Sequence, residues 1–347
     1  MKLAPVPQSI MEWMALKTDL VPVPLAHTHI CFMLSKAVLE AFSLDVFEAF
    51  KDGSKNIEQA AQYTKLDQRA LKSLMNVLIS TGYFTYSNGI YSLTKHARKW
   101  CLKESTHSLY NQQLFNNVCW NWMEYFPKFL KTGKGLQYHE TFNEKEWELY
   151  QNGMASVATG TAKQTVKMAP KLINPDKMLD IGGSHGLYTV EFCKKYPSMK
   201  AVIVDLPPAV EKAEPILRKN YTGDNIQYKK GNALTDDFGK EEYDLVLMSS
   251  LMHHFSLDQN NLVVKKISTA LKKGGYLIIQ EFIRPEPSAK MEMVGTILDL
   301  FFNLSSTSGN WSMDELINFQ KQAGLKHVKI KKFLTLPGFG QVIGQKI

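Results

Sequence analysis

The sequence has few cysteines, and no pattern that would use them in a metal site or a disulfide framework. The four cysteines are Cys31, Cys101, Cys119 and Cys193, with no CxxC pair among them. Zinc sites and disulfide frameworks show regular cysteine spacings, so we expect reduced thiols and no metal. No apolar run approaches the roughly 20 residues that cross a bilayer, and the first residues lack the apolar segment of a secretory signal. We therefore expect a soluble, cytoplasmic protein without a membrane partner.

The sequence also lacks a block of charge of one sign. It has 41 Lys and Arg against 33 Asp and Glu, a formal net charge of +8 at pH 7. The clearest cationic clusters are the isolated pairs Lys194-Lys195, Lys229-Lys230, Lys265-Lys266 and Lys331-Lys332. Such pairs are typical of solvated faces. The length of 347 residues allows two domains, or one large domain with an appended module.

The most informative segment is KMLDIGGSHGLYTVEFCKKYPSMKAVIVDLP, residues 177–207. One apolar run contains Asp180 and stops at Gly182-Gly183, Gly186 opens a helical pattern, and a second apolar run ends on Asp205. Strand, glycine turn, helix, strand and acid in this order indicate the βαβ half of a nucleotide-binding sheet. The glycines let the backbone approach a ligand at the helix N-terminus. The acid is placed to accept hydrogen bonds from ribose hydroxyls.

The glycine spacing of a dinucleotide site is absent. That fingerprint needs glycines at positions one, three and six of the loop. Counting from Gly182 puts Ser184 and Leu187 at the later positions, and counting from Gly183 does no better. A nicotinamide or flavin dinucleotide is therefore disfavoured. On the loop alone, a tight turn in another doubly wound protein stays open.

The residues before about 103 have a winged-helix pattern. Apolar periodicity predicts a helical region within 27–50 and helices over 56–63 and 68–80, and Asn88-Gly89 joins two β-rich runs. A DNA-binding helix should carry a dense cationic stripe, whereas the helix over 68–80 has few cations, so we expect no nucleic-acid partner. The apolar residues upstream better suit burial against another subunit; they are Ile30, Phe32, Met33, Leu34, Val38 and Leu39.

The middle of the chain, residues 104–171, is predicted to be helical and is rich in aromatic residues. Its aromatic and amide cluster comprises Phe115, Asn116, Asn117, Trp120, Asn121, Trp122, Tyr125, Phe126 and Phe129, with Met123. Two interpretations stay open: an ordinary packing interface, or a lid whose rings line a pocket for a flat apolar substrate.

The last part of the chain alternates strands and helices, which predicts a parallel sheet. Further strands are expected at 226–229, 244–248 and 275–281. Ser256 and Gln259 have the spacing of a capping box before a helix over 258–271. The runs 326–331 and 341–346 are expected to form an antiparallel hairpin at the sheet edge, an arrangement absent from dinucleotide dehydrogenases.

Five phrases in order carry a family resemblance. They are D-I-G-G-S-H-G at 180–186, D-L-P at 205–207, G-N-A at 231–233, D-L-V-L-M-S-S-L-M-H-H-F at 244–255 and Q-E-F at 280–282. With SLDVFEAF and GIYSLT nearer the start, they make the chain resemble the plant-type and bacterial class I S-adenosylmethionine-dependent O-methyltransferases. That family includes caffeic acid, hydroxyindole and polyketide O-methyltransferases.

The resemblance implies an α/β fold with a Rossmann-like, seven-stranded class I methyltransferase sheet. It implies a winged-helix dimerisation domain over 1–103, a helical linker and substrate lid over 104–171, and a cofactor-binding domain over 172–347. The expected cofactor is S-adenosyl-L-methionine, the expected substrate a small aromatic molecule, and the expected assembly a homodimer.

The resemblance also assigns site residues. His253 matches the catalytic histidine, a general base that would remove the proton of a phenol, and Glu281 matches the acid that orients its ring. The expected cofactor-binding residues are Asp180, Gly182, Gly183, Gly186, Asp205, Leu206, Gly231, Asn232, Ala233 and Ser249. The expected substrate-binding residues are Phe115, Asn116, Trp120, His254, Asn303 and Asn310.

Four positions depart from the family pattern. His254 stands where an aspartate often follows the catalytic histidine, Ser249 replaces a lysine, and Asn232 and Asn310 replace acids. Because the catalytic set is incomplete, N- or C-methylation, or a non-methylating pericyclic or hydroxylation reaction with the same cofactor, stays open. A winged-helix regulator that senses S-adenosylmethionine is a third hypothesis.

Overall fold

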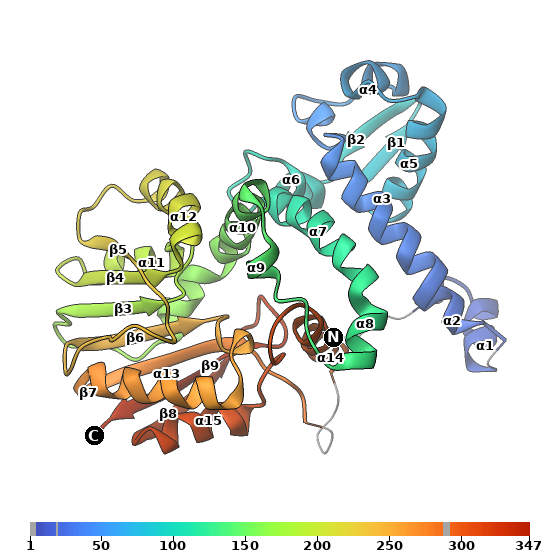
Figure 1. The fold of residues 1–347 in the computed structure, drawn as a ribbon. Coiled ribbons are helices and arrows are strands. Elements are labelled where there is room, and N and C mark those ends of the chain that lie inside the picture. The colour runs from blue at the N-terminus through green and yellow to red at the C-terminus, as the bar shows by residue number, and fades with distance from the viewer. Residues whose placement is uncertain (1–4, 19, 287–291) are drawn as a thin grey trace. The chain divides into compact units, whose positions relative to one another are not determined.

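The computed structural model describes residues 5–18, 20–286 and 292–347. The chain divides into two compact units, residues 2–117 and residues 118–347 (Figure 1). The expected boundaries near residues 103 and 171 stay a prediction.

The N-terminal unit contains the helices and the hairpin that the sequence predicts. Its elements are α1 (Ile10–Lys17), α2 (Val23–Leu25), α3 (Cys31–Ser43), α4 (Ile57–Thr64), α5 (Gln68–Ser80), β1 (Phe84–Ser87), β2 (Ile90–Leu93), α6 (Lys95–Cys101) and the first part of α7 (Tyr110–Trp122). Helix α5 buries Leu71, Met75 and Leu78 on one face. The turn between β1 and β2 places Asn88 and Gly89 at φ of 49° and 82°, the left-handed conformation that a two-residue hairpin turn requires.

The apolar stretch over 27–50 is not one helix. A π-helical turn, Ala26–Ile30, precedes α3, and a short 3₁₀ turn, Glu48–Phe50, follows it. The second half is anchored in the core of this unit, where Phe47 and Phe50 are fully buried. The first half differs, because Ile30 and Met33 are 59% and 54% exposed.

The C-terminal unit is a sheet with helices on both faces (Figure 1). Its helices are α8 (Phe126–Thr132), α9 (Tyr138–Thr141), α10 (Glu144–Met168), α11 (Leu187–Lys195), α12 (Pro207–Asn220), α13 (Leu257–Ala270), α14 (Met293–Ser305) and α15 (Met313–Gln322). Its strands are β3 (Lys177–Ile181), β4 (Lys200–Asp205), β5 (Ile226–Lys230), β6 (Tyr243–Ser249), β7 (Leu271–Phe282), β8 (Leu325–Lys332) and β9 (Phe339–Lys346).

The strand order is β5-β4-β3-β6-β7-β9-β8. Strands β3 to β7 run parallel to one another, and β9 is antiparallel to both β7 and β8. The predicted seven-stranded sheet and its antiparallel edge hairpin are therefore confirmed. The predicted capping box is also present, since the Ser256 side chain accepts from the backbone of Gln259 at the start of α13.

Alternating strand residues build a core on each face of the sheet. Leu179 and Ile181 of β3 pack in the cluster that α13 and α15 cover. Met178 packs on the opposite face with residues of α10, α11 and α12. Because both faces are buried, the central strands are apolar throughout rather than alternating with polar residues.

Parallel strands bring their carboxyl ends to one edge of the sheet. Gly182 follows β3, Asp205 ends β4, Gly231 follows β5 and Ser250 follows β6. Ligands of open α/β sheets bind at this edge.

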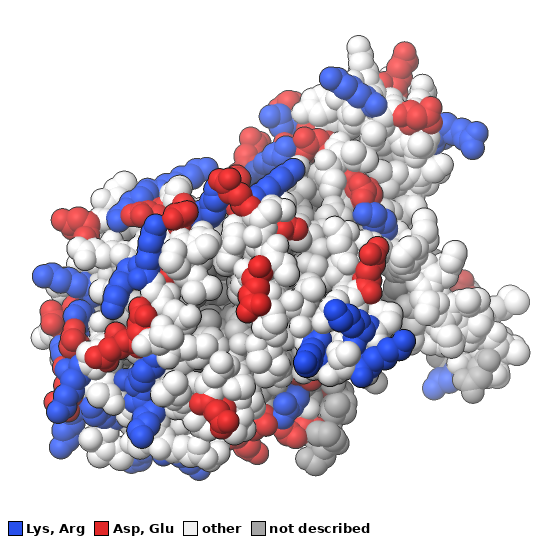
Figure 2. Space-filling view, in the orientation of Figure 1, with Lys and Arg blue, Asp and Glu red and all other residues white. Residues whose placement is uncertain are grey.

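The surface in view mixes Lys and Arg with Asp and Glu (Figure 2). No helix in the described part of the chain has the length and hydrophobicity to cross a membrane.

Replacing Gly183 by alanine should lower the free energy of unfolding by about 1–3 kcal/mol, because the new methyl group would overpack the core. Its Cβ would lie 2.6 Å from Cγ of Asp180 and 2.7 Å from Cγ2 of Ile203. The matched control is Gly160→Ala in α10, where a Cβ would meet nothing within 4 Å. That change should stabilise the helix by up to about 1 kcal/mol. Denaturant titration measures both, and an unchanged unfolding midpoint for Gly183→Ala would contradict the packing argument.

Candidate active site

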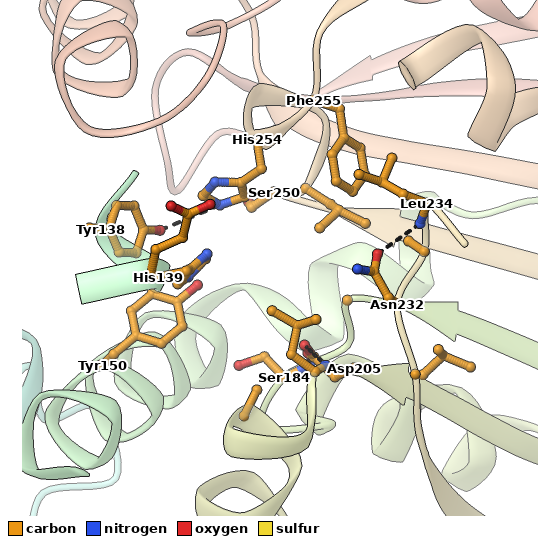
Figure 3. Close-up of a pocket in the computed structure, with 18 of the residues that line it drawn as sticks. Tyr138, His139, Tyr150, Ser184, Asp205, Asn232, Leu234, Ser250, His254 and Phe255 are labelled. Atoms are coloured by element: carbon orange, nitrogen blue, oxygen red, sulfur yellow. Dashed lines mark hydrogen bonds between the residues drawn. The ribbon is translucent and has the colours of Figure 1, made fainter. Parts of the chain in front are cut away.

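A cavity opens along the carboxyl edge of the sheet (Figure 3). One group of lining residues comes from the strand ends: Gly182, Ser184, Val204, Asp205, Leu206, Ala209, Gly231, Asn232, Ala233, Leu234, Ser250 and Leu251. The other group comes from α9, α10 and the loop after β6: Gln137, Tyr138, His139, Glu140, Trp147, Tyr150, Gln151, His254 and Phe255. The cavity thus has a polar wall from the sheet and an aromatic wall from the helices.

Asp205 is fixed by the backbone around it. Its Oδ2 accepts from the Ser184 N–H at 2.8 Å, and its Oδ1 accepts from the Leu206 N–H at 2.8 Å. Burial raises the pKa of this carboxyl to about 6 from an ordinary 3.8, and the two N–H donors oppose that rise. At neutral pH Asp205 is therefore an oriented carboxylate at the cavity wall.

The glycine turn after β3 is held in one conformation. Gly182, Ser184 and Gly186 have φ of 67°, 48° and 70°, so the turn uses the left-handed region three times in five residues. The Ser184 carbonyl accepts from the Tyr228 hydroxyl at 2.7 Å, and the Ser184 hydroxyl donates to the buried Gln151 amide of α10. These bonds from β5 and α10 stabilise the turn, in which Ser184 has a left-handed conformation that costs a non-glycine residue free energy.

The turn also brings its backbone close to the cavity. A Cβ on Gly182 would lie 2.9 Å from Cδ1 of Leu251, which lines the cavity from the loop after β6. Next to it, Asn232 folds its Oδ1 back to accept from the Leu234 N–H at 2.9 Å. Figure 3 shows Ser184, Asp205 and Asn232 together on this side of the cavity.

The opposite wall is a cluster of rings. The ring centroids of His139 and His254 are 4.6 Å apart, and the His139 ring stacks on Trp147 at 5.3 Å and 6°. The Tyr138 hydroxyl lies 3.4 Å from Nε2 of His254 (Figure 3). Burial lowers the pKa of His139 to about 3 and that of His254 well below its ordinary value, with His253 adding to both effects. Both of these rings are neutral at physiological pH.

His253 and Glu281 form a buried pair behind this wall. Nδ1 of His253 lies 3.2 Å from Oε2 of Glu281, and both side chains are 2% exposed. The second carboxylate oxygen accepts from the Met252 N–H at 2.8 Å. The Phe302 ring of α14 packs on the imidazole with centroids 4.0 Å apart. The pair is thus fixed in position by hydrogen bonds on one side and ring packing on the other.

The expected site residues fall into three groups. Those that line the cavity are Gly182, Asp205, Leu206, Gly231, Asn232, Ala233 and His254. Those in the same unit that are not among its lining residues are Asp180, Gly183, Gly186, Ser249, His253, Glu281, Trp120, Asn303 and Asn310. Phe115 and Asn116 belong to the N-terminal unit.

Two of the expected cofactor residues, Asp180 and Ser249, are not among the residues that line the cavity. Asp180 is 1% exposed and accepts from the Thr189 hydroxyl at 2.5 Å. Burial raises its pKa to about 7. Ser249 accepts from the Gln280 amide at 3.0 Å. In the structure these side chains make contacts within the protein, behind the turn and the strand end.

Asn310 differs from the other expected substrate residues. Its backbone N–H donates to Asp299 at 2.9 Å, while neither Oδ1 nor Nδ2 of its buried side chain has a hydrogen-bond partner among the described residues. Asn303 instead donates to the Asp299 carbonyl at 2.9 Å. Burying an amide without hydrogen-bond partners costs free energy. Such a group is therefore a candidate for binding a polar group of a ligand.

Several lining residues were not predicted. Ser184 lies inside the motif at 180–186, so the motif could have identified it as a lining residue. The predicted aromatic cluster covered 115–129, and its role stays a prediction. The rings that line the cavity come from 138–150, within the predicted lid, and from His254 and Phe255. The phrase YHETF at 138–142 supplies rings to many of the ring contacts and has no local signature of its own.

Comparison with known proteins gives a family match. A family model described as an O-methyltransferase domain matches residues 121–326. A probable bifunctional dTTP/UTP pyrophosphatase/methyltransferase protein from Homo sapiens is 24% identical over 74% of this chain, which spans 43% of that longer protein. The 3-hydroxy-5-methyl-1-naphthoate 3-O-methyltransferase of Streptomyces sahachiroi is 22% identical, over 90% of this chain and 92% of its own length.

The fold matches solved structures as well. Human N-acetylserotonin methyltransferase, solved in complex with S-adenosylmethionine, superposes with a TM-score of 0.81 at 18% identity, covering 98% of this chain and 99% of that one. The sheet-end wall fits the same cofactor: it offers an oriented carboxylate at Asp205, an amide at Asn232, and a glycine backbone at Gly182 that leaves no room for a side chain.

The family model covers more than half of the chain, and the fold and the sheet-end wall agree with it. The chain belongs to the O-methyltransferase domain family and is an S-adenosylmethionine-dependent O-methyltransferase.

Proposed function

We propose that this enzyme methylates a hydroxyl group of a small aromatic molecule, with His253 as general base and Glu281 as its orienting partner. The observation that carries the proposal is the buried contact of 3.2 Å between Nδ1 of His253 and the Glu281 carboxylate. A carboxylate accepts, so Nδ1 carries the hydrogen and Nε2 keeps its lone pair for the substrate proton.

The proposed base meets a chemical need of the acceptor. A phenol has a pKa of about 10, so at neutral pH it is a poor nucleophile until its proton is removed. When bound, S-adenosylmethionine supplies a methyl group on a positively charged sulfur. A positioned base typically contributes about 10² to 10⁴ in rate to such a reaction. Glu281 stabilises the imidazolium that forms, and the Met252 N–H keeps the carboxylate in place.

An aromatic acceptor fits the aromatic wall of the cavity. The rings of Tyr138, Tyr150, Trp147 and Phe255 line that wall, and flat rings pack well on aromatic side chains. The relative from Streptomyces sahachiroi is named for a naphthoate, a two-ring aromatic. Asp205, Asn232 and Gly182 would hold the cofactor at the opposite wall, with the Asp205 carboxylate accepting from ribose hydroxyls.

Replacing His253 by asparagine should lower kcat by about 10² to 10⁴, because the base is lost, while cofactor affinity stays within about threefold. Transfer of labelled methyl from S-adenosylmethionine measures the rate, and calorimetry measures the affinity. The matched control is His327→Asn in the outermost strand β8, which should keep full activity. Turnover of His253→Asn at the wild-type rate would eliminate His253 as the base.

Affinity for S-adenosylmethionine should fall as pH drops through about 6. The pKa of Asp205 is raised to about 6, so below that pH the carboxyl is neutral, and it loses both an acceptor oxygen and its attraction for the sulfonium. Well below pH 6 the affinity should fall by about tenfold per pH unit. Calorimetric titration between pH 5 and 8 tests this. Asp205→Asn should bind about 10- to 100-fold more weakly with a flatter profile; a variant with the wild-type pH profile would contradict the assignment.

We also propose a cytoplasmic homodimer that forms through the N-terminal residues 1–103. Helix α1 buries none of its residues, and the apolar side chains of this unit that are exposed include Ile10, Met11, Trp13, Ile30 and Met33. Exposed apolar residues in this number are typical of protein interfaces.

The paired change Ile30→Glu and Met33→Glu should convert the dimer to a monomer, because each glutamate would bury a charge in the interface. Light scattering coupled to gel filtration measures the mass. The control is Arg69→Glu in α5, which also introduces a glutamate at the surface. It should leave the dimer intact. A monomeric wild-type protein at micromolar concentration would rule the dimer out.

A further inference from the structure

The turn that carries His253 is held by side chains from two other segments of the chain. This histidine turn, residues 252–255, consists of the 3₁₀ turn Met252–His254 and of Phe255. Three of its backbone carbonyls accept hydrogen bonds from α13 and from the residues that follow α14. The position of the turn therefore depends on these donors as well as on the strand that precedes it.

Asn260 of α13 joins the two ends of the histidine turn. Its Nδ2 donates to the Met252 carbonyl and to the Phe255 carbonyl, each at 3.0 Å. One side-chain amide thus fixes the first residue of the turn relative to the last. Its Oδ1 has no hydrogen-bond partner among the described residues, so the amide contributes to the structure through its two donated bonds.

The segment 308–311 supplies further donors to the same carbonyls. The Ser308 hydroxyl donates to the Phe255 carbonyl at 2.8 Å, and the Ser308 N–H donates to the His253 carbonyl at 3.1 Å. Nε1 of Trp311 donates to the Met252 carbonyl at 3.0 Å. Each carbonyl that Asn260 binds therefore has a second donor. Loss of the Asn260 amide would leave neither carbonyl buried without a partner, which limits its cost in stability.

Met252 connects these bonds to the pair of His253 and Glu281. Its carbonyl accepts from Asn260, and its N–H donates to Oε1 of Glu281 at 2.8 Å. The other carboxylate oxygen lies 3.2 Å from Nδ1 of His253. A displacement of Met252 would therefore move the carboxylate, and with it the imidazole that the carboxylate orients.

Asn260 occupies a position of α13 where the helical pattern calls for an apolar residue. The other buried residues of this helix are Val263, Val264, Ile267 and Ala270. Asn260 precedes them at the three- and four-residue spacing of one helix face, and it is 0% exposed. A buried amide with an unpaired oxygen in an apolar stripe costs stability. Residues that break a local pattern in this way are expected at functional sites.

From these contacts we infer that Asn260 is a positioning residue for methyl transfer: it fixes Met252, which fixes Glu281, which orients the base His253. The inference rests on the proposed function and adds a residue to it. Asn260 is not among the residues that line the cavity. Its effect on the rate therefore passes through the histidine turn and not through contact with a ligand.

Replacing Asn260 by leucine removes both donated bonds and keeps a side chain of the same branched shape, which suits the apolar stripe. We expect kcat to fall about 10- to 100-fold, because the His253 ring loses its productive position. Calorimetry should give cofactor affinity within about threefold of wild type, since the change affects the base and not the cofactor wall. Denaturant titration should give nearly the wild-type midpoint, because the turn carbonyls keep their second donors. Labelled methyl transfer to a panel of naphthols, hydroxyindoles and hydroxybenzoate esters measures the rate.

The matched control is Asn261→Leu. Asn261 is the next residue of α13, and its Oδ1 likewise has no hydrogen-bond partner among the described residues. This variant makes the same chemical change in the same helix and should keep the wild-type kcat. Asn260→Ala, which removes the amide without adding bulk, is the second variant and decides the question if Asn260→Leu does not fold.

A double-mutant cycle with His253→Asn separates positioning of the base from a general structural effect. If Asn260 acts through His253, adding Asn260→Leu to His253→Asn should lower kcat by less than about twofold further, because the base is already absent. If Asn260 only supports the fold, its loss should lower the rate by the same factor in both backgrounds.

The outcomes are distinguishable. Wild-type kcat in the folded Asn260 variant, or a rate loss that multiplies with that of His253→Asn, would overturn the inference and leave the proposed function standing. Wild-type turnover of His253→Asn would overturn the proposed base and the inference with it. Absence of methyl transfer to every acceptor of the panel would contradict the aromatic hydroxyl acceptor, and the inference would fail with it.

Discussion

The contact between His253 and Glu281 depends on the register of two neighbouring strands. Ser249, near the end of β6, pairs with Gln280 of β7, so the residue after each lies at the same edge of the sheet. His253 follows in the short turn Met252–His254, and Glu281 is the next residue of β7. A slip of one residue would turn Glu281 to the other face. The contact on which the catalytic proposal rests is therefore a consequence of the strand register.

The same edge explains why the cofactor wall and the aromatic wall are close together. Strand ends deliver Gly182, Asp205 and Asn232, and Gln151 of α10 accepts a hydrogen bond from Ser184 in the glycine turn. That bond joins the long helix to the turn, so the helix that carries Trp147 and Tyr150 is fixed against the cofactor wall. One cavity is thus shared by a carboxylate-bearing polar wall and a wall of neutral rings.

Much of the fold could be predicted because its signals are local. The apolar period of α5 gave its bounds, and the capping residues gave the start of α13. The predicted strand over 275–281 was too short, since β7 runs from Leu271 to Phe282. Here β6 and β7 pair with a register shift between Tyr243 and Leu245, an irregularity that depends on both strands together. A single segment cannot reveal it.

The cofactor wall was predictable from motif order, whereas the aromatic wall was not. Contacts such as the stack of His139 on Trp147 join residues eight apart across a helix start, and the contact of His139 with His254 joins segments over a hundred residues apart. The Asn310 amide, which has no hydrogen-bond partner in the described part of the chain, is likewise visible only in the folded structure. These contacts join segments that are distant in the sequence, so identifying them required the structure.

A crystal structure with S-adenosylhomocysteine and an aromatic acceptor would test the central claim most directly. The account predicts that the acceptor hydroxyl lies about 2.6–3.2 Å from Nε2 of His253, with Nδ1 still bonded to Glu281. A hydroxyl held by His254 or His139 instead, with His253 out of hydrogen-bond reach, would contradict it.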